Sequence, residues 1–223
     1  MPTDILALFD LDNTLLQHDS DEQWVAFLID KGAIDAATFK RTSDDIAARY
    51  KRGEAGALEY TEFFLSTLRG RPLAALASLH DAFMDERIRP AVPPSTRELI
   101  ARHQGLGHLC VLTTATSRFL TAPIARELGF EHLIATEPEM VDGHYTGRVV
   151  GVPNMREGKV ERLAAWLDER GRNLADFRES WFYSDSQNDL PLLTRVTHPV
   201  AVNPDAVLAA HARHKGWPQI ALA

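Results

Sequence analysis

Short apolar runs, each ending in polar or turn-forming residues, recur along the chain. They are Ile5 to Phe9, Leu109 to Thr113, Leu133 to Thr136, Trp181 to Tyr183 and Val200 to Val202. Runs this short, bounded by turn formers, are typical of buried strands rather than helices. From residue 95 onward they alternate with segments of helical spacing, which predicts a parallel sheet with right-handed crossovers.

Residues 20–88 follow a different pattern, in which apolar residues recur at helical spacing. We expect helices over about 20–31, 35–52, 58–68 and from Pro72 onward, with Ser20 capping the first and Gly53 ending the second. The predicted fold class is therefore α/β. It is a Rossmann-like doubly wound parallel sheet core at 1–16 and 94–223, with an inserted α-helical bundle cap at 17–93.

Two local signals refine the second part of the chain. Ser95 and Glu98 have the spacing of a capping box at a helix start. Asp142-Gly143 separates two apolar stretches, 139–141 and 145–149, and predicts a hairpin.

Composition limits the classes of function. The chain has 223 residues, 45% of them hydrophobic, with a net charge of -7, which disfavours a nucleic-acid or anionic-membrane surface. Its one cysteine, Cys110, allows no internal disulfide and lies in a predicted strand, so we expect it in the core. The first residues lack the charged region of a signal peptide, and we expect a cytoplasmic protein. The oligomeric state stays open.

Candidate chemistry begins at the end of the first strand. Asp10 and Asp12 follow the apolar run directly, where two carboxylates are costly unless a cation or many donors receive them. The carboxyl ends of parallel strands are also where ligands bind. An acidic turn that merely ends the strand is the structural alternative.

Three further segments carry polar residues at predicted strand ends or helix starts. Thr114 follows the second strand, Lys159 begins a helix, and Asp185 and Asp189 follow Trp181 to Tyr183. Hydroxyls beside a helix N-terminus suit an anion. Thr116 and Ser117 serve equally well as helix caps. The helix dipole disfavours a lysine at a helix start, so the position of Lys159 indicates that an anionic group lies nearby. The alternative interpretation is an exposed surface lysine without a functional role.

Together these segments resemble the motifs of the haloacid dehalogenase superfamily, in order: DLDNTLL, LTTATS, REGKVE and DSQNDLPLL. The resemblance spans most of the chain and implies a phosphatase or phosphotransferase. It implies that Asp10 attacks phosphorus and that Asp12 serves as acid and then as base. It also implies that Thr114 and Lys159 hold the phosphoryl oxygens, with Asn188 as a further hydrogen-bonding residue.

The same resemblance implies a magnesium cofactor. Asp10, the backbone carbonyl of Asp12 and Asp185 would be its ligands. Asp189 would support the site by contacting these groups or by reaching the metal through a water molecule. Hard oxygen ligands in small number, completed by water, suit Mg²⁺.

An all-helical cap between the first two motifs resembles the phosphoserine-phosphatase-like branch. There a carboxylate nine residues after the nucleophile binds the substrate amine, and Asp19 has that offset; a charge at a helix start is the alternative. Phe64 stands where that branch carries a carboxylate-binding arginine. An acid with the aromatics Trp24 and Phe64 suits a phosphorylated amino alcohol such as histidinol phosphate, a small-molecule phosphate ester.

Three alternatives stay open. The protein is a phosphoserine phosphatase, or it transfers the phosphoryl group to another alcohol rather than to water. In the third, it belongs to a different class and binds a phosphometabolite without catalysis.

Overall fold

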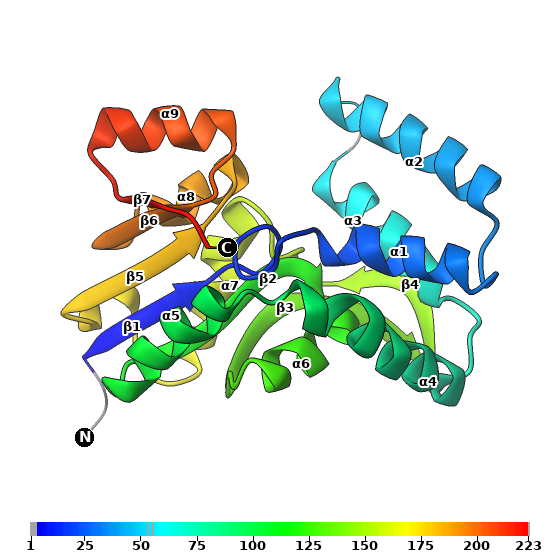
Figure 1. Ribbon diagram of the computed structural model, residues 1–223, viewed down its shortest axis with the longest axis horizontal. Coiled ribbons are helices and arrows are strands. Elements are labelled where there is room, and N and C mark those ends of the chain that lie inside the picture. The colour runs from blue at the N-terminus through cyan, green and yellow to red at the C-terminus, as the bar shows by residue number, and fades with distance from the viewer. Residues whose placement is uncertain (1–3, 53, 55, 223) are drawn as a thin grey trace.

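The computed structural model describes residues 4–52, 54 and 56–222. One sheet runs through the molecule in the order β4-β3-β2-β1-β5-β6-β7 (Figure 1). All neighbouring strands are parallel except β3 and β4, which form an antiparallel hairpin. The strands are β1 (Ile5–Phe9), β2 (Leu109–Ser117), β3 (His132–Val141), β4 (His144–Val150), β5 (Glu179–Ser184), β6 (His198–Val202) and β7 (Gln219–Ile220).

Strand β1 is the topological centre of the sheet. The chain builds β2 and β3 on one side of it and β5, β6 and β7 on the other, so the connections reverse direction at β1. In open α/β sheets the crevice at such a reversal, outside the carboxyl ends of the strands, is the usual ligand site. The two strands bordering this crevice are β1 and β5, which end at Phe9 and Ser184.

Helices cover both faces of the sheet, as a doubly wound fold requires. Side chains alternate between the faces of β1: Ala7 and Phe9 pack in one core cluster, and Leu6 and Leu8 in the other. The first cluster is covered by α5 (Pro94–Gly105) and α6 (Arg118–Glu127), the second by α7 (Glu157–Asp168), α8 (Leu190–Leu193) and α9 (Ala206–Lys215). This confirms the predicted fold class.

In the described part of the chain, four α-helices lie between β1 and α5: α1 (Ser20–Asp30), α2 (Ala36–Lys51), α3 (Ala57–Leu65) and α4 (Leu73–Phe83). A short 3-10 turn at Ser66–Leu68 lies between α3 and α4, and a π-helical turn at Met84–Ile88 and a 3-10 turn at Arg89–Ala91 lie between α4 and α5. The four helices form a separate group beyond the carboxyl edge of the sheet, on the right of Figure 1. We refer to this group as the helical cap. Gly53, the expected end of the second helix, lies outside the described residues.

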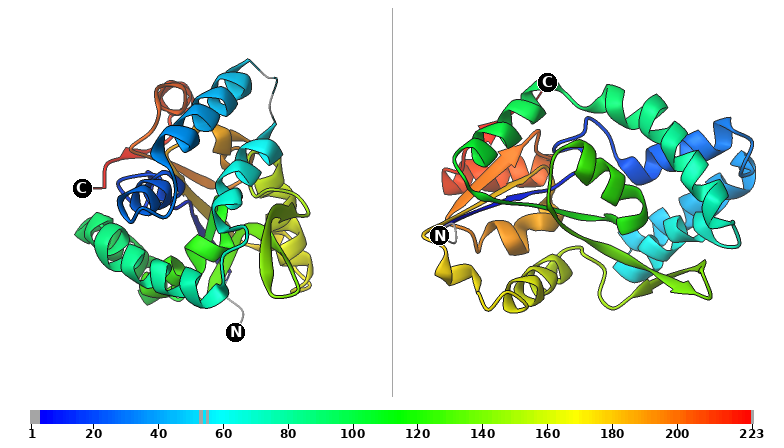
Figure 2. Two further views of the ribbon diagram at one scale, coloured as in Figure 1. Left: turned by 90° about the vertical axis from the view of Figure 1, so that its right-hand side faces the viewer. Right: turned by 90° about the horizontal axis from the view of Figure 1, so that it is seen from below.

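The β3–β4 hairpin forms the floor of the helical cap. It extends from the sheet beneath α3 (Figures 1 and 2). The backbone N–H of Val149 donates to the Glu62 carboxylate (3.2 Å), and Arg69 Nε donates to the carbonyl of Thr146 (3.0 Å). Gly147, with φ +83°, lets the hairpin approach Arg69, because a Cβ there would meet the Arg69 guanidinium at 3.2 Å. The helical cap is thus attached to the core by the hairpin as well as by its two connecting segments.

Several local predictions differ from the structure. Asp19, not Ser20, caps α1, because its carboxylate accepts the Glu22 N–H (3.0 Å) and Ser20 is already helical. Helix α5 begins at Pro94 with Pro93 as its N-cap, so Ser95 lies inside the helix and is not its N-cap, contrary to the prediction. Strand β2 continues beyond Thr113 to Ser117 through an irregularity in its register with β3.

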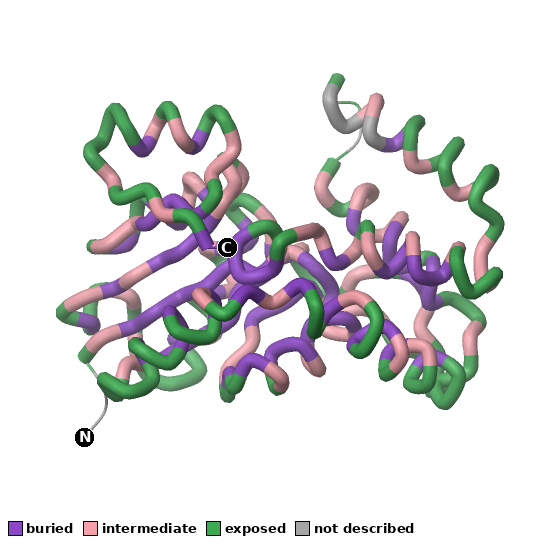
Figure 3. The backbone as a smooth tube through the Cα atoms, viewed as in Figure 1, coloured by how far each residue is buried: buried purple, intermediate pink, exposed green. Residues whose placement is uncertain are grey.

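Burial follows the predicted pattern of the two core segments (Figure 3). Leu6 to Phe9 are completely buried, and Cys110 lies in the core, where burial raises the pKa of its thiol to about 11. Within the described part of the chain, no helix has both the length and the apolar character needed to cross a bilayer.

Candidate active site

The turn after β1 holds the first two aspartates. The backbone N–H of Asp10 donates to the carbonyl of Tyr183 on β5 (2.9 Å), which continues the sheet pairing and fixes the Asp10 backbone. Two residues beyond Leu11, Asn13 adopts φ +56°, a left-handed conformation that asparagine tolerates better than most residues. This turn directs Thr14 back toward the strand ends, where its hydroxyl lies 3.1 Å from Asp10 Oδ2.

Lys159 forms a buried ion pair with Asp10. Its Nζ lies 2.9 Å from Asp10 Oδ1 and 2.8 Å from Asp189 Oδ2, and its side chain is 2% exposed. Ser184 Oγ donates to the same Asp189 oxygen (2.7 Å). Burial alone would lower the pKa of Lys159, but the charges of Asp10 and Asp189 and the hydrogen bonds to them raise it. A permanent cation therefore lies beside the Asp10 carboxylate.

The segment before α7 places Lys159 at this point. Gly158 lies so close to the Pro153 carbonyl that a Cβ there would meet its oxygen at 2.2 Å. Asn154 is fully buried, and its Nδ2 donates to Thr113 Oγ1 (3.1 Å) and to the carbonyls of Thr114 (2.9 Å) and Ile134 (3.1 Å). The start of α7 is thus fastened to the ends of β2 and β3.

Asp12 is oriented by donors from two elements, α1 and β2. Its Oδ1 accepts the Ser20 N–H (2.7 Å) at the start of α1. Its Oδ2 accepts from the hydroxyl of Thr116 (2.8 Å) and lies 3.4 Å from that of Thr114, both on β2. Burial raises the pKa of Asp12 to about 6, with repulsion from Asp19 adding to it. A carboxyl group with such a pKa exchanges a proton readily near neutral pH.

Asp185 completes the strand-end cluster. The Thr14 hydroxyl accepts the Asp185 N–H (3.0 Å) and lies 3.2 Å from Asp185 Oδ1 and 3.1 Å from Asp10 Oδ2. Because a hydroxyl has a single hydrogen, it donates to only one of these two carboxylates at a time. Burial raises the pKa of Asp10 to about 7, with repulsion from Asp189 and Asp12 adding to the shift. Burial also raises the pKa of Asp185 to about 8, with repulsion from Asp10 and Asp189 adding to it.

This donor set fits a hard divalent cation. Asp10 and Asp185 present oxygen ligands, bury negative charge and share one hydroxyl proton, so a cation between them would relieve their repulsion. No cluster of three or more His, Cys, Asp or Glu side chains arranged for a metal exists among the described residues. The predicted set requires only two side chains, since Asp12 would contribute its backbone carbonyl.

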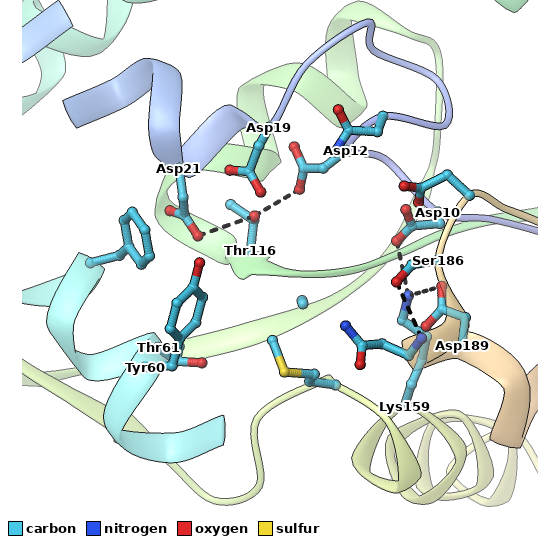
Figure 4. Close-up of a pocket in the computed structure, with 16 residues that line it drawn as sticks. Asp10, Asp12, Asp19, Asp21, Tyr60, Thr61, Thr116, Lys159, Ser186 and Asp189 are labelled. Atoms are coloured by element: carbon cyan, nitrogen blue, oxygen red, sulfur yellow. Dashed lines mark hydrogen bonds and ion pairs between the residues drawn. The ribbon is translucent and has the colours of Figure 1, made fainter. Parts of the chain in front are cut away.

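A cavity of about 330 Å³ opens between the strand ends and the helical cap (Figure 4). Six aspartates and Lys159 line it, together with Thr116, Asn188 and a group from α3. The aspartates are Asp10, Asp12, Asp19, Asp21, Asp185 and Asp189. The residues from α3 are Tyr60, Thr61 and Phe64. No arginine is among the described residues that line the cavity.

Most predicted site residues come together here. All five charged residues predicted for the core part of the site line the cavity: Asp10, Asp12, Lys159, Asp185 and Asp189. Two further predicted residues from the helical cap, Asp19 and Phe64, also line the cavity. Asp19 also caps α1, so it is both a charge at a helix start and a residue of the cavity wall, as the two interpretations of the sequence predicted.

Trp24 is placed elsewhere. It is 1% exposed, its indole N–H donates to Thr67 Oγ1 (3.2 Å), and it packs against Phe27, Phe83 and Phe119 inside the helical cap. The prediction that Trp24 faces the substrate therefore does not agree with the structure.

Thr114 and Asn188 adjoin the predicted site with other partners. Thr114 is fully buried, and its hydroxyl accepts the Thr116 N–H (3.2 Å) and faces Asp12, so Thr116 rather than Thr114 lines the cavity. Asn188 lines the cavity, and its Oδ1 accepts from Arg156 Nε (3.1 Å). Neither Thr116 nor Ser117 caps α6: Thr116 donates to Asp12, and Ser117, the residue before the helix, makes no side-chain cap bond.

Sequence reasoning missed four residues of this site: Asp21, Tyr60, Thr116 as a partner of Asp12, and Asn154. The acidic run at the start of α1 was a signal for Asp21, whose carboxylate lies 3.3 Å from the Thr116 hydroxyl. Burial, with repulsion from Asp19 and Asp12, raises the pKa of Asp21 well above its usual value. Nothing in the local sequence distinguishes Asn154, whose role depends on contacts with β2 and β3.

Known proteins resemble this chain over nearly its whole length. The model of the haloacid dehalogenase-like hydrolase family matches residues 7–194. A histidinol-phosphatase of Neisseria meningitidis serogroup C (strain 8013) is 42% identical over 214 residues, covering 96% of this chain and 96% of that protein. A phosphoserine phosphatase of Mycobacterium tuberculosis (strain ATCC 25618 / H37Rv) is 35% identical over 226 residues, covering 95% of this chain and 68% of that protein.

Solved structures with a similar fold are also known. A protein of unknown function from Bordetella pertussis Tohama I superposes with a TM-score of 0.93 at 50% identity, covering 98% of both chains. A substrate-bound phosphoserine phosphatase superposes with a TM-score of 0.67 at 17% identity, covering 100% of this chain and 93% of that one, a likeness of fold alone. With the family match over residues 7–194, these relatives show that the chain is an enzyme, a phosphatase that belongs to the haloacid dehalogenase-like hydrolase family.

Proposed function

We propose that this enzyme hydrolyses histidinol phosphate, in a magnesium-dependent reaction that passes through a phosphoryl group on Asp10. The observation that carries the substrate assignment is the charge of the cavity wall. Six aspartates line it, and its lysine is already paired with Asp10 and Asp189. Such a wall favours a substrate whose organic end is cationic and disfavours one with a carboxylate. The 42% identical histidinol-phosphatase supports the same assignment.

The first step transfers the phosphoryl group to the enzyme. An Asp10 carboxylate oxygen attacks phosphorus, the bond from phosphorus to the alcohol oxygen breaks, and that oxygen takes the proton held on the Asp12 carboxyl. In the second step Asp12 takes a proton from a water molecule whose oxygen attacks phosphorus, and the bond from phosphorus to the Asp10 oxygen breaks. Inorganic phosphate leaves, and Asp10 and Asp12 return to their starting states.

Charge neutralisation makes the first step possible. Asp10, the backbone carbonyl of Asp12 and Asp185 would hold Mg²⁺, which when bound supplies positive charge to the phosphoryl oxygens. Lys159 supplies a second cation 2.9 Å from Asp10. Asp189 accepts from both Lys159 and Ser184, and these contacts support a role for Asp189 in positioning Lys159 rather than in binding the metal directly.

The phosphoryl oxygens would be bound near β2 and the start of α8. Asn188, which lines the cavity, is the residue we assign to this task beside Lys159, whereas the fully buried Thr114 would support the site from β2 by orienting Asp12. The contact of Thr114 with Asp12 and that of Asn188 with Arg156 fix the orientation of these side chains before the substrate binds.

The helical cap would bind the rest of the substrate. Asp19 lines the cavity near Asp12, where its carboxylate suits an ammonium group, and Phe64 gives an apolar surface. Phosphoserine would bring its carboxylate into this wall without an arginine to receive it, and the loss of a bidentate arginine contact is costly. Histidinol phosphate has the ammonium group and lacks the carboxylate.

The test is a comparison of kcat/KM for three phosphate esters, with and without Mg²⁺. Histidinol phosphate is expected to exceed both L-phosphoserine and p-nitrophenyl phosphate by tenfold or more, and chelation of the metal is expected to abolish turnover of all three. Equal turnover of histidinol phosphate and p-nitrophenyl phosphate would reject the substrate, and undiminished turnover after chelation would reject the metal.

A further inference from the structure

The acidic wall of the cavity has two carboxylates on the helical cap, Asp19 and Asp21, at different distances from the chemistry. In Figure 4, Asp10 and Lys159 lie at one end of the cavity and Asp19 lies between Asp10 and Asp21. Burial raises the pKa of Asp19, and the charge of Asp185 makes a small further contribution, which agrees with the position of Asp19 nearer the strand ends.

The hydrogen bonds of the two carboxylates differ. Asp19 Oδ1 accepts the Glu22 N–H at 3.0 Å, so part of this side chain is used to cap α1. The Asp21 carboxylate lies 3.3 Å from the Thr116 hydroxyl, but the same hydroxyl lies closer to Asp12, at 2.8 Å. Because Thr116 has one hydrogen to donate, Asp12 is the preferred acceptor and Asp21 keeps acceptor capacity for a ligand.

The end of the cavity that holds Asp21 is also its aromatic end. Tyr60 and Phe64, one turn apart on α3, line the same cavity with their rings 5.3 Å apart, edge to face. Figure 4 shows the Tyr60 ring below Asp21, on the side of the cavity away from Lys159. A carboxylate beside two aromatic rings matches a flat heterocycle that carries an N–H donor, because the rings pack on its face and the carboxylate accepts its hydrogen.

We propose that Asp21 is a specificity-determining residue that accepts a hydrogen bond from the imidazole ring of the substrate. This inference rests on the proposed function and refines it. The order along the cavity, Asp10, Asp19, then Asp21 with Tyr60, reproduces the order of groups in histidinol phosphate: phosphate, ammonium, ring. Asp19 would bind the ammonium group and Asp21 the N–H of the ring. The preferred substrates are therefore phosphorylated amino alcohols that carry an N–H heterocycle.

The experiment measures a ratio of two kcat/KM values. One substrate is histidinol phosphate, and the other is O-phosphoethanolamine, which keeps the phosphate and the ammonium group and lacks the ring. In Asp21→Asn the ratio is expected to fall about tenfold to a hundredfold, the range for one hydrogen bond to a charged group. Asp21→Glu keeps the charge and is expected to retain more of the ratio than Asp21→Asn does.

Two matched variants on the same helix complete the design. Glu22→Gln removes an exposed carboxylate one residue away and is expected to keep the wild-type ratio. Asp19→Asn is expected to lower kcat/KM for both amine-bearing substrates, with a smaller change in their ratio. Thermal unfolding of each variant shows whether it is folded, and Asp21→Glu provides the measurement if Asp21→Asn is not.

The results distinguish a failure of the Asp21 assignment from a failure of the proposed function. A wild-type ratio preserved in Asp21→Asn, or an equal fall for both substrates, would overturn the assignment of Asp21 while leaving the proposed function standing. A wild-type enzyme that turns over histidinol phosphate no faster than p-nitrophenyl phosphate would instead overturn the proposed function, and the role of Asp21 with it.

Discussion

The two walls of the cavity are built on different principles. The wall at the strand ends consists of residues whose backbones belong to the sheet or its connections, and their side chains bind one another through short contacts such as Lys159 to Asp10 and Asp189. The wall of the helical cap consists of side chains on α1 and α3 that point into the cavity, among them Asp21, Tyr60 and Phe64.

This difference suggests a division of roles, in which the strand-end wall carries out catalysis and the wall of the helical cap determines substrate selectivity. Charges at the strand ends are held by parallel strands that meet at one edge, so changing one of them should affect every substrate. Side chains of the helical cap depend on how helices pack over that edge, so changing one of them should affect substrates unequally. The predictions below test this division of roles, from the largest expected effect to the smallest.

Replacement of the nucleophile should have the largest effect. Asp10→Asn removes the attacking carboxylate, because an amide is not a nucleophile toward phosphorus, and kcat should fall by at least roughly 10⁴-fold on every phosphate ester tried. Steady-state kinetics measure this fall, with circular dichroism to confirm the fold. A fall in kcat confined to histidinol phosphate would mean that Asp10 selects the substrate. It would contradict the division of roles between the strand-end wall and the helical cap.

Loss of the buried cation should damage both activity and stability. Lys159→Met leaves Asp10 and Asp189 without their partner, so the free energy of unfolding should fall by about 3–5 kcal/mol. Denaturant titration measures it. The matched control is Lys215→Met on the exposed side of α9, where a change within about 0.5 kcal/mol is expected. Similar losses in the two variants would show that the Lys159 ion pair contributes no net stability.

Two aromatic residues of the helical cap should behave differently. Phe64→Leu removes a ring from the cavity wall and should raise KM for histidinol phosphate about tenfold. Trp24→Phe removes the hydrogen bond to Thr67 inside the helical cap and should lower the free energy of unfolding by about 1 kcal/mol with little change in KM. A larger change in KM for Trp24→Phe than for Phe64→Leu would mean that Trp24, not Phe64, contacts substrate.

The smallest expected effect on activity concerns His103, a buried histidine of the core that does not line the cavity. His103 contacts Tyr183 and His108, and burial lowers its pKa to about 4, from an ordinary value near 6.5. The unfolded chain therefore binds a proton on His103 between pH 6.5 and 4 that the folded chain does not. Its contribution to stability is complete above pH 6.5 and is lost as the pH falls toward 4.

His103→Gln should reduce this pH dependence by at most about 1.4 kcal/mol per pH unit. Denaturant titrations at several pH values between 4 and 7 measure the slope in both proteins. Identical slopes would show that His103 titrates normally in the folded enzyme.

Much of the strand-end wall could be predicted from sequence because topology alone brings it together. Once β1 and β5 are parallel neighbours, residues directly after them must lie at one edge, which places Asp10 near Asp185. Lys159 followed from its position at a helix start. Thr116 did not follow, because β2 continues past Thr113 and its register shifts before Ser117, so counting from the apolar run stops too early.

The helical cap was harder to predict for a physical reason. Helical spacing identifies an apolar face but not what that face packs against. Trp24 and Phe64 are both aromatic and both lie on apolar faces; one packs in the interior of the helical cap and the other lines the cavity. Likewise, the acidic start of α1 did not reveal which carboxylate caps the helix and which keeps an open acceptor.

The central claim is that phosphorus bonds to Asp10 during turnover, and an acyl phosphate can be detected directly. Enzyme quenched while it turns over histidinol phosphate, then reduced with borohydride and digested, should yield a peptide in which Asp10 has been reduced to homoserine. Omission of substrate should leave Asp10 unchanged. Unmodified Asp10 in enzyme that is releasing phosphate at its full rate would contradict the account, because phosphate would then be transferred to water without passing through this carboxylate.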